Sequence, residues 1–217
     1  MIIDLNLQNK KIIVIGGGNE AQKRINSLLK QECEIIVISD SVNYHISKLS
    51  KLNKIKIKKQ KIKDTSFIAK LKPDIIITTT DDKKLNQKII TETKKKNILA
   101  YSSDNPEESD FSNPAIINFE NIVQIAIFTG GNSPAMSKKL KIKSEKVFKK
   151  IITKQDITQI KIQKIARKLA KETIPTQIKR KAYLHNIMND KKIEQLIKDN
   201  QVKKAEKRAV TILKNWK

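Results

Sequence analysis

The chain has 217 residues, of which 38% are hydrophobic, and a net charge of +24, a composition that favours a folded protein over a disordered one. The single cysteine, Cys33, excludes an intrachain disulfide, and the two histidines, His45 and His185, are too few and too isolated for a structural metal site. Because the chain has neither a signal peptide at its start nor a run of about 18 apolar residues, we expect a cytoplasmic protein that does not enter a membrane.

The first hundred residues alternate between short apolar runs and segments with helical spacing of apolar residues. This alternation is typical of an α/β fold, and it predicts a Rossmann-like, doubly wound parallel sheet covered by helices on both faces. Right-handed crossovers place the carboxyl ends of such strands at one edge, where ligands bind. Strands are predicted at 11–15, 34–39, 54–58, 74–79 and 97–102, and helices at 21–31, 42–52, 65–72 and 83–96.

The pattern changes after residue 104. Residues 105–114 have the composition of a loop, and two strands, 115–119 and 122–128, are predicted to form a hairpin around Glu120 and Asn121. A second loop follows, in which Ser133 is a candidate helix N-cap with Pro134 at the first helical position. The rest of the chain is predicted to be helical, with interruptions near 173–175 and 189–190.

A glycine motif, Gly16-x-Gly18-x-x-Ala21, lies between the first predicted strand and the first helix. Gly16 permits a tight turn, Gly18 lets the backbone approach a pyrophosphate, and Ala21 allows the helix to pack closely on the sheet. The unpaired N–H groups at the start of the helix attract the anion. Such turns also occur without a ligand, but the strand–turn–helix context predicts a dinucleotide site.

Asp40 ends the second predicted strand, about 20 residues beyond the glycines. A carboxylate at this place accepts a hydrogen bond from the ribose 2′-OH of NAD and repels the 2′-phosphate of NADP, so NAD is the expected cofactor. Ser41 beside it is a candidate for the same ribose contact. The alternative is that Asp40 is a turn residue without a ligand.

Three further positions follow strands at the same edge. Thr80 is expected near the cofactor, with Asp81 or Asp82 as the N-cap of the next helix. Asp104 follows the fifth strand, where a carboxylate is well placed for proton transfer. The residue pattern alone equally fits an aspartate in a surface turn.

Four segments occur together in a characteristic order: IIVIGGGNEAQKRINSLL (12–29), TTTDDKKLNQKI (78–89), YSSDNPEESDFSNPAII (101–117) and FTGGNSPAMSKKLK (128–141). In this combination the chain resembles the precorrin-2 dehydrogenase/sirohydrochlorin ferrochelatase family, which includes the amino-terminal half of siroheme synthase. The resemblance covers roughly residues 5–150, and the helical tail is compatible with it. It implies a homodimer with an NAD-binding Rossmann domain over residues 1–114, a dimerisation segment over 115–150 and a basic helical domain over 151–217.

The resemblance also implies roles for individual residues. Asn19, Glu20, Asp40 and Ser41 match the nucleotide contacts of the family, and Asp104 matches its essential aspartate, which is proposed to assist proton removal and chelation. A further stretch matches a loop that lines the tetrapyrrole cleft, although the family often has serine at the first of its positions. The substrate-binding residues expected there are Thr129, Gly130, Asn132 and Ser133.

The expected function is the NAD-dependent oxidation of precorrin-2 to sirohydrochlorin in siroheme or cobalamin biosynthesis. A bifunctional protein that also inserts Fe²⁺ is one alternative, and a nucleotide-sensing module whose basic tail binds nucleic acid is a more distant one. A nucleotide sensor would not need the 101–117 segment, so the presence of this segment disfavours the sensor. We therefore expect precorrin-2, and neither nucleic acid nor a membrane, as the partner.

The net charge has three explanations. Residues 1–140 hold 23 Lys/Arg and 15 Asp/Glu, whereas residues 141–217 hold 23 and 7. Only four of the basic residues are arginine, which fits a general bias toward lysine and disfavours nucleic-acid recognition. A polyanionic substrate such as precorrin-2, an octacarboxylate, would also be attracted by such a field.

Overall fold

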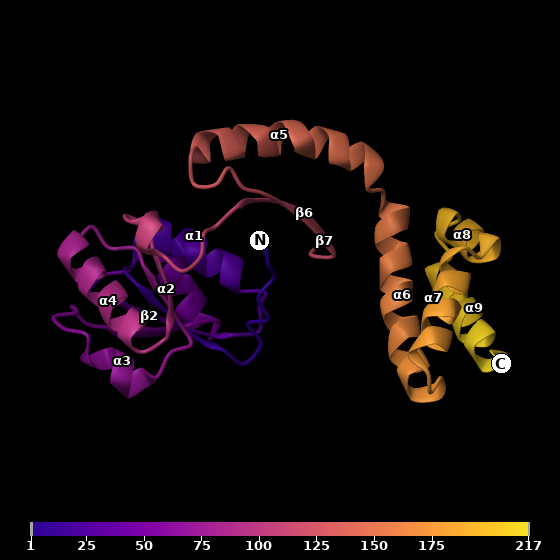
Figure 1. Ribbon diagram of the computed structural model, residues 1–217, viewed down its shortest axis with the longest axis horizontal. Helices are drawn as coiled ribbons and strands as arrows, with labels where there is room; N and C mark the ends of the chain where they lie inside the picture. The colour runs from indigo at the N-terminus through magenta and orange to yellow at the C-terminus, as the bar shows by residue number, and fades with distance from the viewer. Residues whose placement is uncertain (1, 217) are drawn as a thin grey trace. The chain divides into compact units, whose positions relative to one another are not determined.

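The computed structural model describes residues 2–216 and divides into two compact units, Met1–Asn113 and Pro114–Lys217 (Figure 1). The first unit ends one residue before the expected boundary at 114. The further division expected at residue 150 stays a prediction. No helix within residues 2–216 is long and apolar enough to cross a membrane.

The first unit is a parallel sheet with the strand order β3-β2-β1-β4-β5. The order reverses between β1 and β4, which is the point where doubly wound sheets bind their ligands. This confirms the expected Rossmann-like fold. In chain order the elements are β1 (Lys11–Ile15), α1 (Asn19–Leu28), β2 (Glu34–Ser39), α2 (Tyr44–Lys51), β3 (Lys56–Lys59), α3 (Ser66–Leu71), β4 (Ile75–Thr78), α4 (Lys83–Lys95), β5 (Leu99–Ser102) and the short 3₁₀ helix η1 (Pro106–Glu108).

Alternate residues of the central strands are buried on opposite faces of the sheet. Figure 1 shows the helices of this unit packed around the sheet. Ile12 and Val14 of β1 pack on the face that α1 and α2 cover. Ile13 and Ile15 pack on the other face, against residues of α3 and α4 such as Phe67. Continuous runs of isoleucine and valine therefore bury both faces of the central strands, and the carboxyl ends of these strands are where ligands bind in such sheets.

The predicted helix over residues 21–31 differs most from the observed one. α1 begins two residues earlier, because Gly18 is its N-cap. It ends at Leu28, and the turn that follows includes Glu32 with a φ of 52°. The helical spacing of the apolar residues was correct, but the polar residues at both ends gave no signal for the boundaries.

The second unit combines a hairpin with helices. Glu120 and Asn121 have φ values of 53° and 57° and lie in the turn between the two strands, where the backbone N of Ile122 donates to the carbonyl of Phe119 at 2.9 Å. Ser133 caps α5 as expected, accepting a hydrogen bond from the backbone N of Met136 at 3.2 Å. The elements are β6 (Ala115–Phe119), β7 (Val123–Ile127), α5 (Pro134–Ile151), α6 (Lys154–Thr173), α7 (Gln177–Met188), α8 (Lys191–Lys198) and α9 (Val202–Lys214).

Two helix breaks were missing from the prediction. The first, at residues 152–153, is a capping box in which Thr153 and Asp156 exchange side-chain and backbone hydrogen bonds. The second lies between α8 and α9, where Asn200 has a φ of 57°. Helices α6 to α9 enclose a core of their own around Tyr183, whose hydroxyl donates to the carbonyl of Ala209 at 2.9 Å.

Asp190 joins two helices of this core. Its side chain caps α8 by accepting from the backbone N of Ile193 at 2.8 Å, and it accepts two hydrogen bonds from Arg208 of α9, at 2.8 and 2.6 Å. The hydrogen bonds from Arg208 lower the pKa of Asp190 below its ordinary value, although burial acts in the opposite direction.

We expect Asp190→Asn to lower the free energy of unfolding at neutral pH by about 1–2 kcal/mol, because asparagine keeps the cap and loses the ion pair. The lowered pKa stabilises the folded state fully above the unfolded-state pKa of about 3.9, and this contribution is lost as the pH falls through the folded-state value. Denaturant titrations at several pH values should therefore show the difference between the two proteins shrinking below about pH 4.

The control is Asp199→Asn at the other end of α8, where the carboxylate accepts from Gln195 and from no other residue within 2–216. This change should alter stability by less than about 0.5 kcal/mol. A difference between unmodified protein and Asp190→Asn that stays constant down to about pH 3 would show that the ion pair contributes nothing.

Candidate functional site

The three glycines between β1 and α1 meet different surroundings. Gly16 has a φ of 113°, and a Cβ there would lie 2.5 Å from Oγ1 of Thr79. A Cβ on Gly17 would lie 2.0 Å from the backbone oxygen of Ser41. Nothing lies within 4 Å of the position of a Cβ on Gly18. Packing therefore requires the first two glycines, whereas Gly18 leaves open space at the start of α1.

This open space adjoins the amino-terminal end of α1. Gly18 is the N-cap and supplies no side chain to the first N–H groups, which begin at Asn19 and Glu20. Ala21 is fully buried beneath them, so the helix packs closely on the sheet. The arrangement is that of an anion site, with unpaired donors and the positive end of a helix dipole facing a gap that a side chain does not fill.

Glu20 is held in place by two cations of its own helix. It forms ion pairs with Lys23, at 3.0 Å, and with Arg24. Burial raises the pKa of Glu20, but the hydrogen bonds and charges of Lys23 and Arg24 outweigh it, so that the pKa lies below its ordinary value. Arg24 also donates to the hydroxyl of Tyr101 at 3.0 Å and lies over its ring, 4.7 Å from the centroid. No local pattern predicts the contact between Arg24 and Tyr101, which are 77 residues apart.

A cavity of about 180 Å³ lies at the carboxyl ends of β1, β2 and β4. It brings together Gly16, Asp40 and Thr80, three of the residues singled out in the sequence, with Lys61 also in its wall. Asp40 is exposed, and its side chain forms no hydrogen bond with any residue within 2–216. Ser41 lies next to it, with its backbone oxygen against Gly17. Ligand pockets usually measure about 300–1,000 Å³, so this cavity by itself is too small to enclose a whole dinucleotide.

Asp104 belongs to a hydrogen-bond network at the same edge. Its Oδ1 accepts from Nδ2 of Asn86 at 2.8 Å and from Oγ of Ser102 at 2.6 Å. The Ser102 hydroxyl also lies 2.9 Å from Oγ1 of Thr78. Asn86, Ser102 and Thr78 are buried, so the network is shielded from water on the side of the sheet.

Asn86 connects this network to the cavity. Its Nδ2 also donates to the backbone oxygen of Thr80 at 2.9 Å, and its Oδ1 accepts from the Thr80 hydroxyl at 2.7 Å. A single side chain therefore ties Thr80 to Asp104. The sequence analysis did not single out Asn86 or Ser102, although both lie within segments that carry the resemblance.

Asp82 is the aspartate that caps α4, since it accepts from the backbone N of Leu85 at 2.9 Å. Asp81 is exposed, and among residues 2–216 its side chain has no hydrogen-bond partner. Of the two histidines, His45 contacts Asn26 at 3.1 Å and His185 lies on α7 in the other unit.

The loop over residues 129–133 belongs to the second unit. The Thr129 hydroxyl donates to the backbone oxygen of Ser133 at 3.0 Å and lies 2.9 Å from the hydroxyl of Ser137. Asn132 donates from its side chain to the backbone oxygen of Thr129 at 2.8 Å, and Gly130 has a φ of 62°. The polar groups expected to bind a substrate therefore also hold the loop in its conformation.

The parallel sheet, the glycine turn and the gap at the start of α1 together define a nucleotide-binding protein of the Rossmann type. Comparison with protein families agrees: a family described as "Putative NAD(P)-binding" matches residues 3–115, more than half of the chain. The chain belongs to this NAD(P)-binding family.

Comparison with individual proteins is more specific than the match to the family. A "Putative precorrin-2 dehydrogenase" of Methanocaldococcus jannaschii is 28% identical over 199 residues, which cover 89% of this chain and 92% of the relative. The "Siroheme synthase" of Actinobacillus succinogenes is 24% identical over 93% of this chain, but the match spans only 40% of that longer protein. Among solved structures, "SirC, precorrin-2 dehydrogenase" shares the fold, with a TM-score of 0.71, 20% identity and coverage of 96% of this chain and 99% of the other.

The glycine turn yields a paired prediction. Gly17→Ala should lower the free energy of unfolding by more than about 2 kcal/mol, because the new Cβ meets the Ser41 backbone. Gly18→Ala should leave stability nearly unchanged, since the new Cβ meets no protein atom, and should weaken NAD(P) binding at least about tenfold by filling the gap.

Thermal denaturation and a titration with NAD⁺ separate the two effects. The outcome that contradicts this assignment is a Gly18→Ala protein that is both as stable as the unmodified one and equally tight in binding NAD⁺, because the gap would then not receive the nucleotide.

Proposed function

We propose that this protein is an NAD-dependent dehydrogenase that oxidises precorrin-2 to sirohydrochlorin. Three things support the proposal: the NAD(P)-binding family, the names of the relatives, and a match along nearly the full length of the Methanocaldococcus jannaschii protein. The structural observation that carries it is the network in which Asn86 ties the candidate acid–base group Asp104 to Thr80 at the nucleotide crevice. A redox enzyme of this kind needs its bound cofactor and its acid–base group at one place.

The residues of the crevice suit a bound dinucleotide. The gap at Gly18 and the free N–H groups of α1 would receive its pyrophosphate, and Asp40 would accept from the ribose 2′-OH. When bound, NAD⁺ supplies an acceptor for a hydride. The remaining residues that we assign to its binding are Gly16, Asn19, Glu20, Ser41 and Thr80.

Asp104 is the proposed proton acceptor. The oxidation removes two hydrogens from the macrocycle, one as a hydride and one as a proton, so a base is required. The two hydrogen bonds to Oδ1 orient the carboxylate, and no residue within 2–216 donates to Oδ2. The Oδ2 atom is therefore available to accept the substrate proton.

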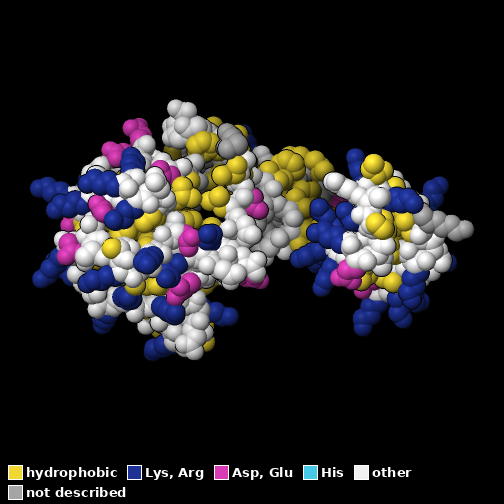
Figure 2. Space-filling model, turned by 60° about the horizontal axis from the view of Figure 1, so that its bottom comes forward, with side chains coloured by type: hydrophobic (Ala, Val, Ile, Leu, Met, Phe, Trp, Pro, Cys, Tyr) yellow, Lys and Arg dark blue, Asp and Glu magenta, His cyan; other side chains and the backbone are white. Residues whose placement is uncertain are grey.

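The 129–133 loop and the basic surface would serve the substrate. We assign the loop residues Thr129, Gly130, Asn132 and Ser133 to the tetrapyrrole cleft, as the resemblance implies. Precorrin-2 is an octacarboxylate, and on the surface that Figure 2 shows, Lys and Arg side chains are widely distributed and outnumber Asp and Glu. Steering of this anion by the field would raise its rate of association.

We also propose that the protein acts as a cytoplasmic homodimer. Along α5, the apolar residues Met136, Leu140, Val147 and Ile151 recur at helical spacing and are exposed. An exposed apolar face of this kind is typical of an interface. Light scattering that gives the mass of a single 24.8 kDa chain would contradict the homodimer.

The structure offers no observation that favours the two alternative functions. Within residues 2–216, no group of three or more His, Cys, Asp or Glu is arranged to hold a metal ion. Iron insertion stays a prediction of the resemblance, which an assay with sirohydrochlorin and Fe²⁺ can test. Salt-dependent binding of duplex DNA without turnover would instead favour the nucleic-acid module.

Asp104→Asn tests the proposed base. Asparagine can still accept from Asn86 and Ser102 at the Oδ1 position, but it has neither the charge nor a basic second oxygen. We expect kcat to fall at least about 100-fold, with NAD⁺ affinity unchanged within about twofold. The measurement is NADH formation, together with the sirohydrochlorin spectrum, after purified protein is mixed with precorrin-2 and NAD⁺.

Asp81→Asn is the matched control, since Asp81 lies at the same edge outside the network, and it should keep full activity. Normal turnover in Asp104→Asn would remove Asp104 from the mechanism. Absence of NADH formation with the unmodified protein would contradict the proposed function itself.

Asp40→Asn tests the preference for NAD. Since Lys61 lines the same cavity, removal of the carboxylate leaves a cation to meet the 2′-phosphate of NADP. We expect the ratio of kcat/KM for NADP over NAD to rise at least about tenfold. The double variant Asp40→Asn, Lys61→Gln should lose most of this gain, and an unchanged ratio in both would show that Asp40 does not contact the ribose.

A further inference from the structure

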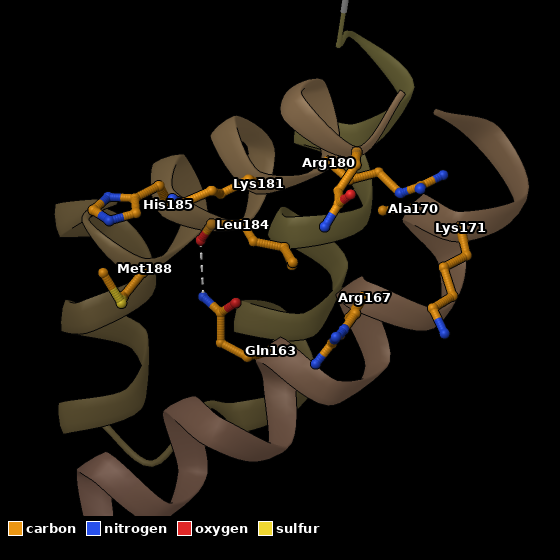
Figure 3. A pocket seen from close by; sticks show the side chains of 10 residues that line it. Gln163, Arg167, Ala170, Lys171, Arg180, Lys181, Leu184, His185 and Met188 are labelled. Carbon is orange, nitrogen blue, oxygen red and sulfur yellow. Dashed lines mark hydrogen bonds between the residues drawn. The ribbon is translucent and has the colours of Figure 1, made fainter. Parts of the chain in front are cut away.

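A groove of about 450 Å³ lies between α6 and α7, entirely within the helical part of the second unit (Figure 3). Its size is that of a small-molecule site. The nucleotide crevice, by contrast, is built only from residues of the first unit. The lining residues are Gln163, Arg167, Ala170 and Lys171 from α6 and Gln177, Arg180, Lys181, Leu184, His185 and Met188 from α7.

The groove is strongly basic. Its lining includes four Lys or Arg residues and no Asp or Glu. Among residues 2–216, the side chains of Arg167, Lys171 and Lys181 form neither a hydrogen bond nor an ion pair, so their charges are available to a ligand. Arg167 and Lys171 are also one helical turn apart, and like charges at this spacing destabilise a helix. The groove therefore concentrates positive charge, which lowers the stability of α6, and no acidic side chain among residues 2–216 pairs with these three cations.

The arginines show that lysine bias does not account for the groove. The chain has only four, and three of them have structural partners: Arg24 binds Glu20, Arg208 binds Asp190, and Arg180 donates to the carbonyls of Ile174 and Pro175. Only Arg167 has a guanidinium without a partner among residues 2–216, and it lies in the groove. Because guanidinium groups bind carboxylates and phosphates with two parallel hydrogen bonds, Arg167 suits an oxyanion.

The wall between the cations is apolar. Leu184, Met188 and Ala170 contribute to it, and the Gln163 amide is turned toward the backbone by donating to the carbonyl of Leu184 at 3.1 Å, as the dashed line in Figure 3 shows. Such a groove can cover apolar surface of a ligand while the surrounding cations bind its charged groups.

We propose that the α6–α7 groove is a second ligand site, which binds the carboxylate-bearing edge of an organic polyanion with an apolar body. The choice of carboxylates over phosphates rests on the proposed function, because the substrate and product named there are polycarboxylates. Arg167 and Lys171 hold the carboxylates, Lys181 adds charge from the opposite helix, and Leu184 and Met188 contact the apolar part.

The test compares two double variants of the same helix with the same change in charge. Arg167→Gln, Lys171→Gln removes two groove cations, whereas Lys164→Gln, Lys168→Gln removes two exposed lysines of α6 that do not line the groove. The probe is uroporphyrin, a stable octacarboxylate macrocycle, titrated by fluorescence in the presence of saturating NAD⁺. Thermal denaturation checks that both variants remain folded.

The groove pair should weaken uroporphyrin binding at least about tenfold, equivalent to about 1.4 kcal/mol, and the control pair by less than about twofold. Equal losses in the two variants, or no binding to the unmodified protein, would overturn the proposal. Pyrophosphate or duplex DNA that binds more tightly than uroporphyrin, with the same dependence on the groove pair, would overturn the assignment to carboxylates.

The NADH assay on the same preparations distinguishes this proposal from the proposed function. If the protein turns over precorrin-2 but the groove pair binds uroporphyrin as tightly as the control pair does, only the proposal of a second ligand site is contradicted. If uroporphyrin binding is weakened in the groove pair alone but the unmodified protein does not turn over precorrin-2, only the proposed dehydrogenase function is contradicted.

Discussion

The side chain of Asn86 is the contact on which the candidate site depends. Its amide donates both to the Thr80 backbone and to Asp104, and its oxygen accepts from the Thr80 hydroxyl. Because it is buried, loss of these partners would leave unsatisfied polar groups inside the protein. One buried amide therefore holds Thr80, at the cavity, next to the carboxylate of Asp104.

The sheet and its ligand edge were predictable, because their causes are local. Runs such as Ile12–Ile15 fit only a strand buried on both faces, and the turn Gly16–Gly18 requires residues without a Cβ. Predicting that Gly16, Asp40 and Thr80 share one edge needed only the handedness of the crossovers. The structure places all three around one cavity.

Other features depend on contacts between distant residues, which no local pattern reveals. The contact between Arg24 and Tyr101 joins α1 to β5, and three other strands lie between these two elements in the chain. In the sequence, Asn86 looks like any polar residue of a helix. Only the fold shows that it lies beside Asp104. The groove lined by Arg167 and Lys181 likewise requires α7 to fold back on α6, and the sequence shows only basic helices. Composition predicted the charge of the tail but not that it surrounds a groove.

The buried clusters of the two units have a consequence for how the protein tolerates change. The two hydrophobic clusters on either side of the sheet consist of buried residues of the first unit. The buried residues of the cluster around Tyr183 come from α6 to α9. A mutation that loosens one interior leaves the packing of the other as it was. Calorimetry would then be able to record separate melting events, and the helical end could diverge or be exchanged during evolution while the nucleotide-binding half retained its fold.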